Sequence, residues 1–269
     1  MAGCCGESKL GSIRQIILHS VQLTIECSLA ILAPAHLQKD EPEGSSFCTK
    51  KEKLMSTSKS PVLLIAGGPS GGGKSTFVQI IRHLLYLIFK REVLVISTDH
   101  YYRDLSHLAP RARARVNFDS PDAMDFDLLL EHIQYMMGGK AFDRPTYDFK
   151  THTRIGIERI DPKQCAVIVI EGILALHDDR NVTLAGKGTV YVDVPQIICF
   201  MRRLLRDRKM RGRSVWSITS QYLRTVLPGY RRYIEPSARK ANIRVHSGGY
   251  NPLGILEALR YIEQMLEHT

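Results

Sequence analysis

The glycine-rich segment at 63–81, "LLIAGGPSGGGKSTFVQII", constrains the fold more than any other part of the chain. Residues 68–75 match the pattern G-x-x-x-x-G-K-[ST], which forms a phosphate-binding loop where it follows a buried strand and opens a helix. Both flanks meet that condition, because 62–66 is wholly apolar and the residues after Lys74 have helical spacing. The segment therefore predicts a strand, a loop that binds nucleotide phosphates, and a helix, in that order.

The chemistry of such a loop gives its residues distinct roles. Successive backbone N–H groups and the helix N-terminus surround the β-phosphate. The lysine reaches the β- and γ-phosphates and the hydroxyl after it reaches Mg²⁺, so we assign these roles to Lys74 and Ser75. A glycine-rich turn with an incidental lysine is the alternative. The expected nucleotide-binding residues are Gly68, Pro69, Ser70, Gly71, Gly72, Gly73, Lys74, Ser75 and Thr76.

Further apolar runs alternate with longer helical patterns along the chain. Runs that are apolar throughout indicate strands covered on both faces, and hence a parallel sheet between helices. The sequence thus predicts an α/β fold in three layers around a mostly parallel five-stranded sheet, with ligands beyond the carboxyl ends of its strands. The predicted strands are 62–66, 92–97, 165–172, 189–194 and 241–246, and the predicted helices are 75–90, 125–137, 196–209, 217–227 and 254–266.

Residues 1–60 differ from the rest of the chain. A helix-like apolar segment precedes "LQKDEPEGSSFCTKKEKLMSTSKS", whose charge and Pro, Gly and Ser content is typical of a linker. We expect an N-terminal extension over 1–60, largely linker or disordered, and a folded domain over 61–269, with Met55 an equally plausible start. Glu26 interrupts the apolar segment, which disfavours both a secretory signal and a membrane helix.

Charge and cysteine content narrow the class of protein. The six cysteines form no C-x-x-C pair, so we expect free thiols, no zinc and a cytoplasmic location. The formal net charge of +10 suits a nucleic-acid binder, an acidic membrane surface or a site for several phosphates. The position of the charge favours the last of these classes.

The basic residues concentrate in "RRLLRDRKMRGRS" at 202–214, which holds seven basic residues and one Asp. Arg203, Arg206 and Arg213 are spaced to project from a helix and the turn after it. That spacing suits a lid that closes over phosphates and excludes water from the transfer. A solvated basic face or a nucleic-acid patch is the alternative, but no aromatic residues interleave with the run.

Two carboxylates end predicted strands at the expected ligand edge. Asp99 follows the second strand, where it would face the γ-phosphate and accept the proton of an attacking hydroxyl; capping the next helix is the alternative. Glu171 ends a wholly apolar run, where a charge is costly unless it holds metal or water. We assign Ser75, Glu171 and Asp99 to a Mg²⁺ site, with a structural hydrogen-bonding role as the alternative for Glu171.

Two segments between these strands suit a sugar and a planar base. The first, 117–129, combines Phe118 with Asp119, Asp122 and Asp125, whose carboxylates can accept hydrogen bonds from sugar hydroxyls, although two of these three would equally start the helix after Pro121. The second, 144–154, presents aromatic and imidazole side chains that can stack on a base, with ordinary packing as the alternative. The residues concerned are Asp119, Asp122, Asp125, Tyr147, Phe149 and His152.

The motifs together resemble those of the uridine kinase (uridine–cytidine kinase) family of P-loop nucleoside kinases over residues 61–261. The segments that carry the resemblance are "GGPSGGGKST", "STDHYYRDL", "NFDSPDAMDFDLL", "PTYDFKTHTR", "IVIEGILAL", "RRLLRDRKMRGRS" and "YIEPSARKANI". The resemblance implies that ATP or GTP, with Mg²⁺, phosphorylates the 5′-hydroxyl of uridine or cytidine. It also implies a small β-hairpin over the nucleoside and often a tetramer, with no nucleic-acid or membrane partner.

The resemblance also implies roles for individual side chains. Asp99 would be the base, with Lys74 and Arg206 as its catalytic partners. Asp119 and Arg213 would bind ribose, and Tyr147 and His152 would read the pyrimidine edge. The remaining substrate-side residues are Tyr102, Phe118, Phe149, Arg203 and Gln221, and the lid residues that contact nucleotide phosphates are Arg206 and Arg211.

Two other functions stay open at this point. The first is a kinase of another small alcohol, resembling phosphoribulokinase or a pantothenate kinase. The aromatic cluster at 147–152 disfavours it, because such a substrate has no aromatic face. The second is a nucleotide-binding regulator without transfer activity, which the intact Lys74, Asp99 and Glu171 disfavour.

Overall fold

The computed structural model describes residues 61–113 and 115–268, and the predicted extension over 1–60 lies outside them. The described residues fall in one compact unit. Its strands are β1 (Val62–Gly67), β2 (Glu92–Ser97), β3 (Phe142–Asp148), β4 (Thr153–Ile160), β5 (Cys165–Glu171), β6 (Thr189–Asp193) and β7 (Ile243–His246). The five predicted strands are therefore confirmed to within two residues at each end.

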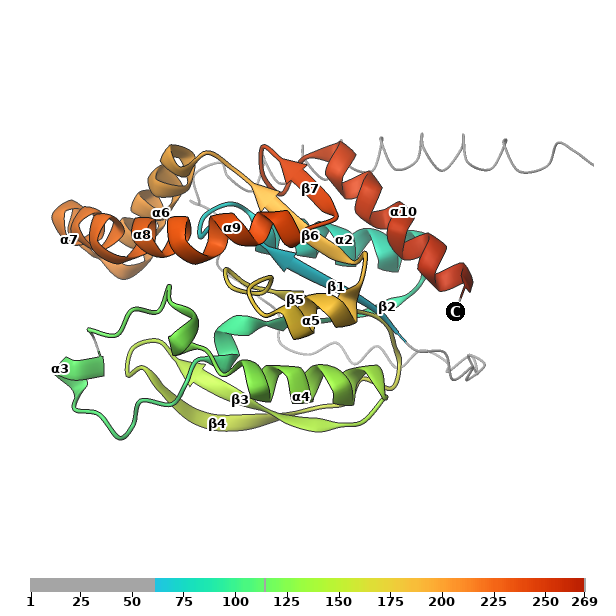
Figure 1. Ribbon diagram of the computed structural model, residues 1–269, viewed down its shortest axis with the longest axis horizontal. Coiled ribbons are helices and arrows are strands. Elements are labelled where there is room, and N and C mark those ends of the chain that lie inside the picture. Colours follow the sequence, from blue (N-terminus) through green and yellow to red (C-terminus); the bar gives the residue numbers. More distant parts are fainter. Residues whose placement is uncertain (1–60, 114, 269) are drawn as a thin grey trace, which may run out of the picture. The chain divides into compact units, whose positions relative to one another are not determined.

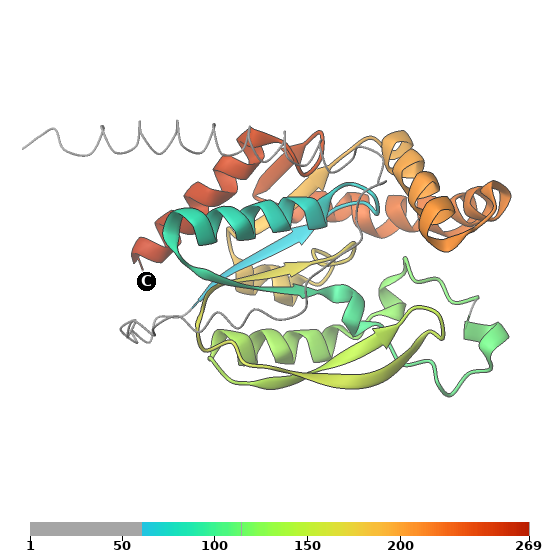
Figure 2. The same cartoon turned by 180° about the vertical axis from the view of Figure 1, so that it is seen from behind.

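Five of these strands form a sheet in the order β2-β5-β1-β6-β7, and every neighbouring pair in it is parallel. The central strand β1 is buried along its whole length because helices cover both faces of the sheet, whereas the edge strand β7 alternates buried and exposed residues. Helices α2 (Lys74–Phe89) and α10 (Pro252–His268) lie over the face shown in Figure 2, while α5 (Asp179–Ala185) lies over the face shown in Figure 1. The predicted three-layer α/β fold is confirmed.

The remaining helices lie around this sandwich. They are η1 (Thr98–Tyr101), α3 (Pro110–Arg113), η2 (Pro121–Ala123), α4 (Phe126–Met137), α6 (Gln196–Arg211), α7 (Val215–Gln221), η3 (Tyr222–Val226), α8 (Leu227–Gly229), η4 (Tyr230–Ile234), α9 (Glu235–Ser237) and η5 (Ala238–Lys240). In the described part of the chain, no helix is long and apolar enough to span a membrane.

The helix predicted to end at 227 instead continues to Lys240, so that prediction was wrong. Two segments with wider π turns, η3 and η4, precede Pro228 and Pro236. A proline lacks the N–H of a regular helical hydrogen bond, and a local π turn accommodates it without ending the helix. The buried residues are spaced four apart, so one face stays on the core throughout. They are Tyr222, Val226, Tyr230, Ile234 and Ala238.

A second, antiparallel sheet consists of β3 and β4 alone, and α4 packs beside it. The turn of this hairpin spans 149–152. The hairpin turn, the carboxyl ends of the parallel strands and α6 all lie toward the same side of the molecule in Figure 1 and Figure 2. The fold therefore gathers the segments that the sequence singled out around one edge of the sheet.

Candidate active site

The loop after β1 has the backbone of a phosphate cradle. Gly68, Gly71 and Gly73 have positive φ values of 134°, 84° and 91°. At Gly68 a Cβ atom would lie 2.5 Å from the carbonyl oxygen of Val192, so only glycine fits there. Gly73 forms the N-cap of α2, which points the free N–H groups of that helix at the loop.

Lys74 is buried beneath this loop, with 7% of its surface exposed, and its Nζ donates to the carbonyl oxygen of Pro69 at 3.0 Å. Burial lowers the pKa of Lys74, and the carboxylates of Glu171 and Asp99 oppose that shift. The two acidic residues therefore stabilise the charged ammonium that a phosphate chain requires.

Glu171 and Ser97 share one register position on β5 and β2, and Ala66 of β1 pairs with Glu171 from the other side. This register brings the ends of three strands level. Ser75 Oγ, in the first turn of α2, donates to Glu171 Oε2 at 2.9 Å. The structural hydrogen bond considered as an alternative for Glu171 is therefore present, and it places two oxygen ligands side by side.

These oxygens fit a Mg²⁺ ion bound together with phosphate. Mg²⁺ takes six oxygens in octahedral geometry and usually receives only one or two from carboxylates, with the rest from phosphates and water. Among the described residues, no group of three or more His, Cys, Asp or Glu side chains could hold an ion. Ser75, Glu171 and Asp99 would therefore complete a site only with a phosphate chain in the loop.

Asp99 lies in the first turn of η1, immediately after β2. The N-cap of that helix is Ser97, whose Oγ accepts from the Asp99 N–H at 3.3 Å, so capping is not the role of the Asp99 carboxylate. Gly172 lies directly behind this turn. A Cβ atom there would lie 1.8 Å from Thr98 Oγ1, so only glycine lets the ends of β2 and β5 approach this closely.

Asp119, Asp122 and Asp125, the three acidic residues proposed for sugar binding, divide as the sequence allowed. Asp125 is the N-cap of α4 and accepts from the Leu128 N–H, and Asp122 lies in the first turn of η2. Asp119 has no such capping role and is buried, with 8% of its surface exposed. Burial raises the pKa of the Asp119 carboxyl, and the guanidinium of Arg203 opposes the shift.

An aromatic cluster forms between the Asp119 segment and the hairpin. Tyr102 is central: its ring centroid lies 5.4 Å from that of Phe118 and 5.5 Å from that of Tyr147. The His152 ring stacks on Phe118 at 4.6 Å and 19°, while Phe149 packs edge-on against Tyr147 at 5.3 Å. The structure thus brings together the five predicted aromatic and imidazole residues.

Two polar atoms in this cluster are buried but unsatisfied. The hydroxyl oxygen of Tyr147 and Nδ1 of His152 have no hydrogen-bond partner among the described residues. A buried polar atom without a partner is costly and calls for an explanation such as a missing ligand. Burial raises the pKa of Tyr147 to about 12 and lowers the pKa of His152, so both groups are neutral at pH 7.

The hairpin turn is organised by Asp148, which sequence reasoning missed. Its carboxylate accepts from the N–H groups of Lys150 and Thr151 and from the Thr151 hydroxyl at 2.7 Å. His152 follows in a left-handed conformation with φ of 55°, which is uncommon for a residue with a side chain. Arg154, also missed, fastens the turn by donating to the carbonyl oxygen of Tyr102 and to Asp125.

The basic run of 202–214 is gathered by its single acidic residue, Asp207. Arg213 Nη1 donates to Gln221 Oε1 at 2.7 Å, and Arg203 Nη2 donates to the same oxygen at 3.3 Å. Arg203, Arg206 and Arg213 all contact Asp207. The side chain of Arg211 lies outside the described part of the structure. A lone acid among seven basic residues was the signal that could have identified Asp207.

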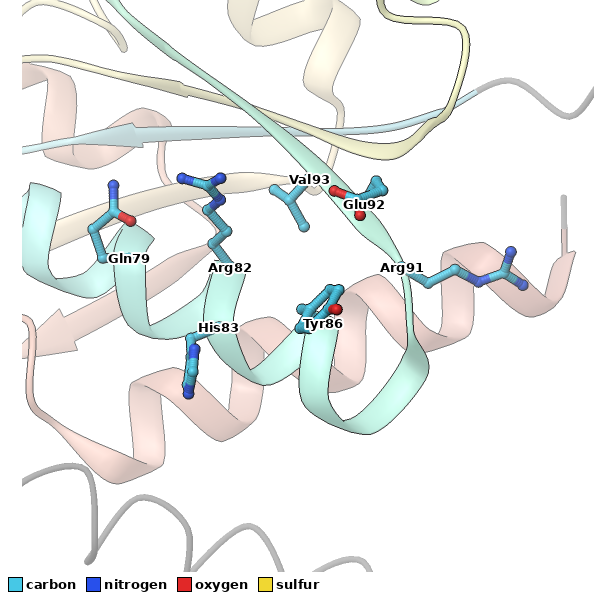
Figure 3. Close-up of a pocket in the computed structure, with 7 residues that line it drawn as sticks. All are labelled: Gln79, Arg82, His83, Tyr86, Arg91, Glu92 and Val93. Atoms are coloured by element: carbon cyan, nitrogen blue, oxygen red, sulfur yellow. The ribbon is translucent and has the colours of Figure 1, made fainter. Parts of the chain in front are cut away.

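Two cavities lie in the described part of the structure, in different places. One of about 220 Å³ borders the aromatic cluster and is lined in part by Arg103, Phe118 and Asp122. The other, of about 450 Å³, lies on the outer side of α2 beside the start of β2. Figure 3 shows Arg82 and His83 leaving the helix in opposite directions there, so its polar groups do not converge. The edge that holds Lys74 and Asp99, not this larger hollow, is therefore the candidate active site.

Curated relatives and a solved structure match most of this unit. The chain is 43% identical to a uridine kinase of Brevibacillus brevis over 72% of this chain and 89% of the relative. It is 39% identical to a uridine kinase of Pasteurella multocida over 79% and 99% of the two chains. A phosphoribulokinase structure from Rhodobacter spheroides, at 17% identity and a TM-score of 0.53, covers 73% of this chain and 74% of its own. That structural likeness shows the fold alone.

A family model places these likenesses in one group. The model described as the phosphoribulokinase/uridine kinase family matches residues 63–253, which include the P-loop, both carboxylates, the hairpin and the basic run. Kinases of this group transfer a phosphoryl group from a nucleotide bound by the P-loop. This chain belongs to the phosphoribulokinase/uridine kinase family.

Proposed function

We propose that this protein is a uridine–cytidine kinase. It transfers the γ-phosphoryl group of ATP or GTP to the 5′-hydroxyl of uridine or cytidine, with Mg²⁺, and yields the nucleoside monophosphate. The family membership and the sequence similarity to uridine kinases support this proposal independently of the geometry of the site.

The observation that carries the proposal is the aromatic cluster with its two unsatisfied polar atoms. The hydroxyl of Tyr147 and Nδ1 of His152 lie among rings that can enclose a planar base. A pyrimidine offers a flat face for these rings and polar edge atoms for both partners. A neutral His152 can donate to a carbonyl oxygen or accept from an amine, depending on which ring nitrogen carries the proton, so it suits both bases.

The ribose would lie between the aromatic cluster and the P-loop. The Asp119 carboxylate accepts hydrogen bonds from the ribose hydroxyls, and the Arg213–Gln221 pair faces the sugar from the lid. The 5′-hydroxyl then points at Asp99, across from the loop. This orientation follows from fixing the base at one end and the phosphate chain at the other.

The transfer itself needs one proton acceptor and several fixed positive charges. Asp99 takes the proton of the 5′-hydroxyl while the hydroxyl oxygen bonds to the γ-phosphorus. At the same time, the bond between that phosphorus and the oxygen that bridges the β- and γ-phosphates breaks. Lys74 and Arg206 balance the charge on the phosphate oxygens as ADP leaves. Bound Mg²⁺, held by Ser75 and Glu171, would supply further charge neutralisation at the β- and γ-phosphates.

Three parts of the proposal concern the surroundings of the enzyme. Arg203, Arg206 and Arg213 of the basic run are held by Asp207 and Gln221 beside the P-loop edge, which supports phosphate binding over nucleic-acid binding. The free thiols of Cys165 and Cys199 are compatible with a reducing cytoplasm. A homo-oligomer, tetrameric by resemblance, is expected and can be measured by light scattering.

An acceptor panel tests the proposed function. Purified protein is incubated with Mg-ATP and, separately, uridine, cytidine, adenosine, ribulose 5-phosphate and pantothenate, and ADP release and product mass are followed. We expect phosphorylation of the two pyrimidine nucleosides only. Turnover of ribulose 5-phosphate or pantothenate with none of uridine would contradict the proposal and favour a kinase of another small alcohol.

A further inference from the structure

Asp207 is the only acidic residue in the basic run and the most deeply buried, with 0% of its side chain exposed. It lies on α6 and contacts three arginines. Arg206 Nε lies 3.1 Å from its Oδ1, while Arg213 Nη1 and Arg203 Nε lie 3.6 and 3.7 Å from its Oδ2. One carboxylate therefore touches Arg203, Arg206 and Arg213, three of the four arginines that we assign to the lid.

The arginines around Asp207 serve different halves of the site. Arg206 is close enough to Lys74 to lower the pKa of that lysine, although burial is the larger cause. On the same helix, Arg202 Nη1 donates to the carbonyl oxygen of Gly71 at 3.2 Å, which fastens α6 to the P-loop. These contacts tie one side of Asp207 to the phosphate donor.

The other side of Asp207 leads to the nucleoside. Burial raises the pKa of Asp119, the expected ribose ligand, and the nearby positive charge of Arg203 lowers it again in part. Arg203 and Arg213 also converge on Gln221 Oε1, and Arg213 Nη2 donates to Ser217 Oγ at 3.0 Å. Asp207 thus joins α6 to α7 at the point where the acceptor would bind.

Electrostatics makes this arrangement depend on the carboxylate. Arg203 has 11% of its side chain exposed and Arg213 has 28%, so water does little to screen them from each other. Burial lowers the pKa of Arg203, and Asp119 and Asp207 oppose the shift. A neutral residue at 207 would leave the guanidinium groups repelling one another, and they would separate.

We propose that Asp207 is a positioning residue that couples binding of the phosphate donor to binding of the nucleoside. A phosphate chain that draws Arg206 toward the loop also orders Arg203 and Arg213 through their shared carboxylate, and nucleoside binding acts in the reverse direction. Asp207 touches neither substrate. The coupling to uridine rests on the proposed function, whereas the effect of Asp207 on donor binding does not.

Calorimetric titration of the full chain tests this role. The affinity for uridine is measured with and without Mg²⁺ and the non-hydrolysable donor AMP-PNP, and the affinity for Mg-AMP-PNP is measured with and without uridine. In the natural protein we expect each ligand to tighten the other by about tenfold. In Asp207→Asn this factor should fall to about one, and the affinity for Mg-AMP-PNP alone should fall by about twofold to thirtyfold.

Asp127→Asn is the matched control, because Asp127 pairs with Arg180 on the surface and has 78% of its side chain exposed. It should keep the natural coupling. Thermal unfolding of each variant separates the proposal from a merely structural role, which would lower the melting temperature without changing the coupling. Should Asp207→Asn not fold, Asp207→Glu keeps the charge one methylene away and should show reduced coupling.

Wild-type coupling in a folded Asp207→Asn, or in Asp207→Glu where only that variant folds, overturns the proposal. Failure of the proposed function is distinct: the natural protein would then bind Mg-AMP-PNP but not uridine. In that case the affinity for Mg-AMP-PNP decides the role of Asp207. An unchanged affinity in the variant refutes the role, and a fall that Asp127→Asn does not share supports it.

Discussion

The donor and acceptor halves of the candidate site are built in different ways. The phosphate cradle of the donor half is a run of consecutive residues, 68–76, formed by backbone N–H groups and the start of α2, to which Glu171 and the lid arginines are added from elsewhere. The acceptor half gathers side chains from the residue that follows η1, the 117–119 segment, the end of β3 and the hairpin turn, which are distant in sequence. A short sequence pattern can therefore specify the phosphate cradle. The acceptor half depends on how the fold brings separate segments together, and single side-chain substitutions can alter the acceptor that it binds.

Substitution of Asp99 should separate the functions of the two halves most sharply. Asp99 acts on the acceptor hydroxyl, so its loss should slow the transfer while leaving ATP binding at the donor half intact. Asp99→Asn cannot take the proton of the 5′-hydroxyl, so we expect kcat to fall by about 10² to 10⁴ with little change in ATP affinity. Single-turnover transfer and ATP titration measure the two quantities. Asp161→Asn, at the turn before β5, is the control and should keep full activity. Near-normal turnover in Asp99→Asn would remove the proposed base.

Gly172 joins the two halves, since it lets the end of β5 approach the turn that carries Asp99. Gly172→Ala would place Cβ 1.8 Å from Thr98 Oγ1, so we expect a loss of about 1–3 kcal/mol in the free energy of unfolding. Urea denaturation measures this loss. Gly156→Ala on β4 meets no atom within 4 Å and should be close to neutral. Equal stability of the two variants would show that the close approach is unimportant.

Substitution of Tyr147 tests whether the acceptor half binds the polar edge of a base. Tyr147→Phe keeps the ring and removes the unsatisfied hydroxyl. We expect KM for uridine to rise by roughly twofold to tenfold, equivalent to a neutral hydrogen bond of about 0.5–1.5 kcal/mol, with KM for ATP unchanged. Tyr135→Phe, whose hydroxyl bonds Glu131 on the surface of α4, serves as the control. A change in KM for ATP alone would move Tyr147 out of the acceptor half.

The lowered pKa of His152 leads us to predict a pH dependence of KM for uridine. Burial lowers its pKa, so the neutral ring persists below the ordinary value of about 6.5. We expect KM for uridine to be flat from pH 8 to about 6.5 and to rise only as the pH falls further and the ring gains a proton. The stability contribution of the neutral ring is lost in the same direction. In His152→Ala this rise should be absent, and a rise that persists there must come from another group.

The same contrast explains what the sequence could predict. Most strands were predictable because they are largely continuous apolar runs, and the P-loop because its pattern is local; β7 is the exception among the strands, since it alternates apolar residues with Arg244 and His246. Asp207 stood out in the sequence as a lone acid, but its role was not predictable, because that role appears only when α6 and the turn after it bring three arginines together. The helix through 240 was missed because Pro228 and Pro236 normally end helices, whereas here buried residues spaced four apart hold both π turns against the core.

Asp148 and Arg154 were missed for a related reason. Both read as ordinary polar residues of a hairpin, and only the folded turn shows that they position Phe149 and His152. Tyr147, Phe149 and His152 themselves were predicted because side chains of these types can stack on a planar base and hydrogen-bond to it. Chemistry carried by residue type was therefore visible in the sequence, but the contacts that orient it were not.

Phosphoryl transfer to uridine and to 5′-deoxyuridine, side by side, tests the central claim most directly. Both nucleosides present the same pyrimidine to Tyr147 and His152, but only uridine carries the hydroxyl that faces Asp99. With γ-labelled Mg-ATP, we predict labelled uridine 5′-monophosphate, and competitive inhibition without labelling by 5′-deoxyuridine. Label on 5′-deoxyuridine, or no label on uridine, would contradict the claim that this site phosphorylates a pyrimidine nucleoside at its 5′-hydroxyl.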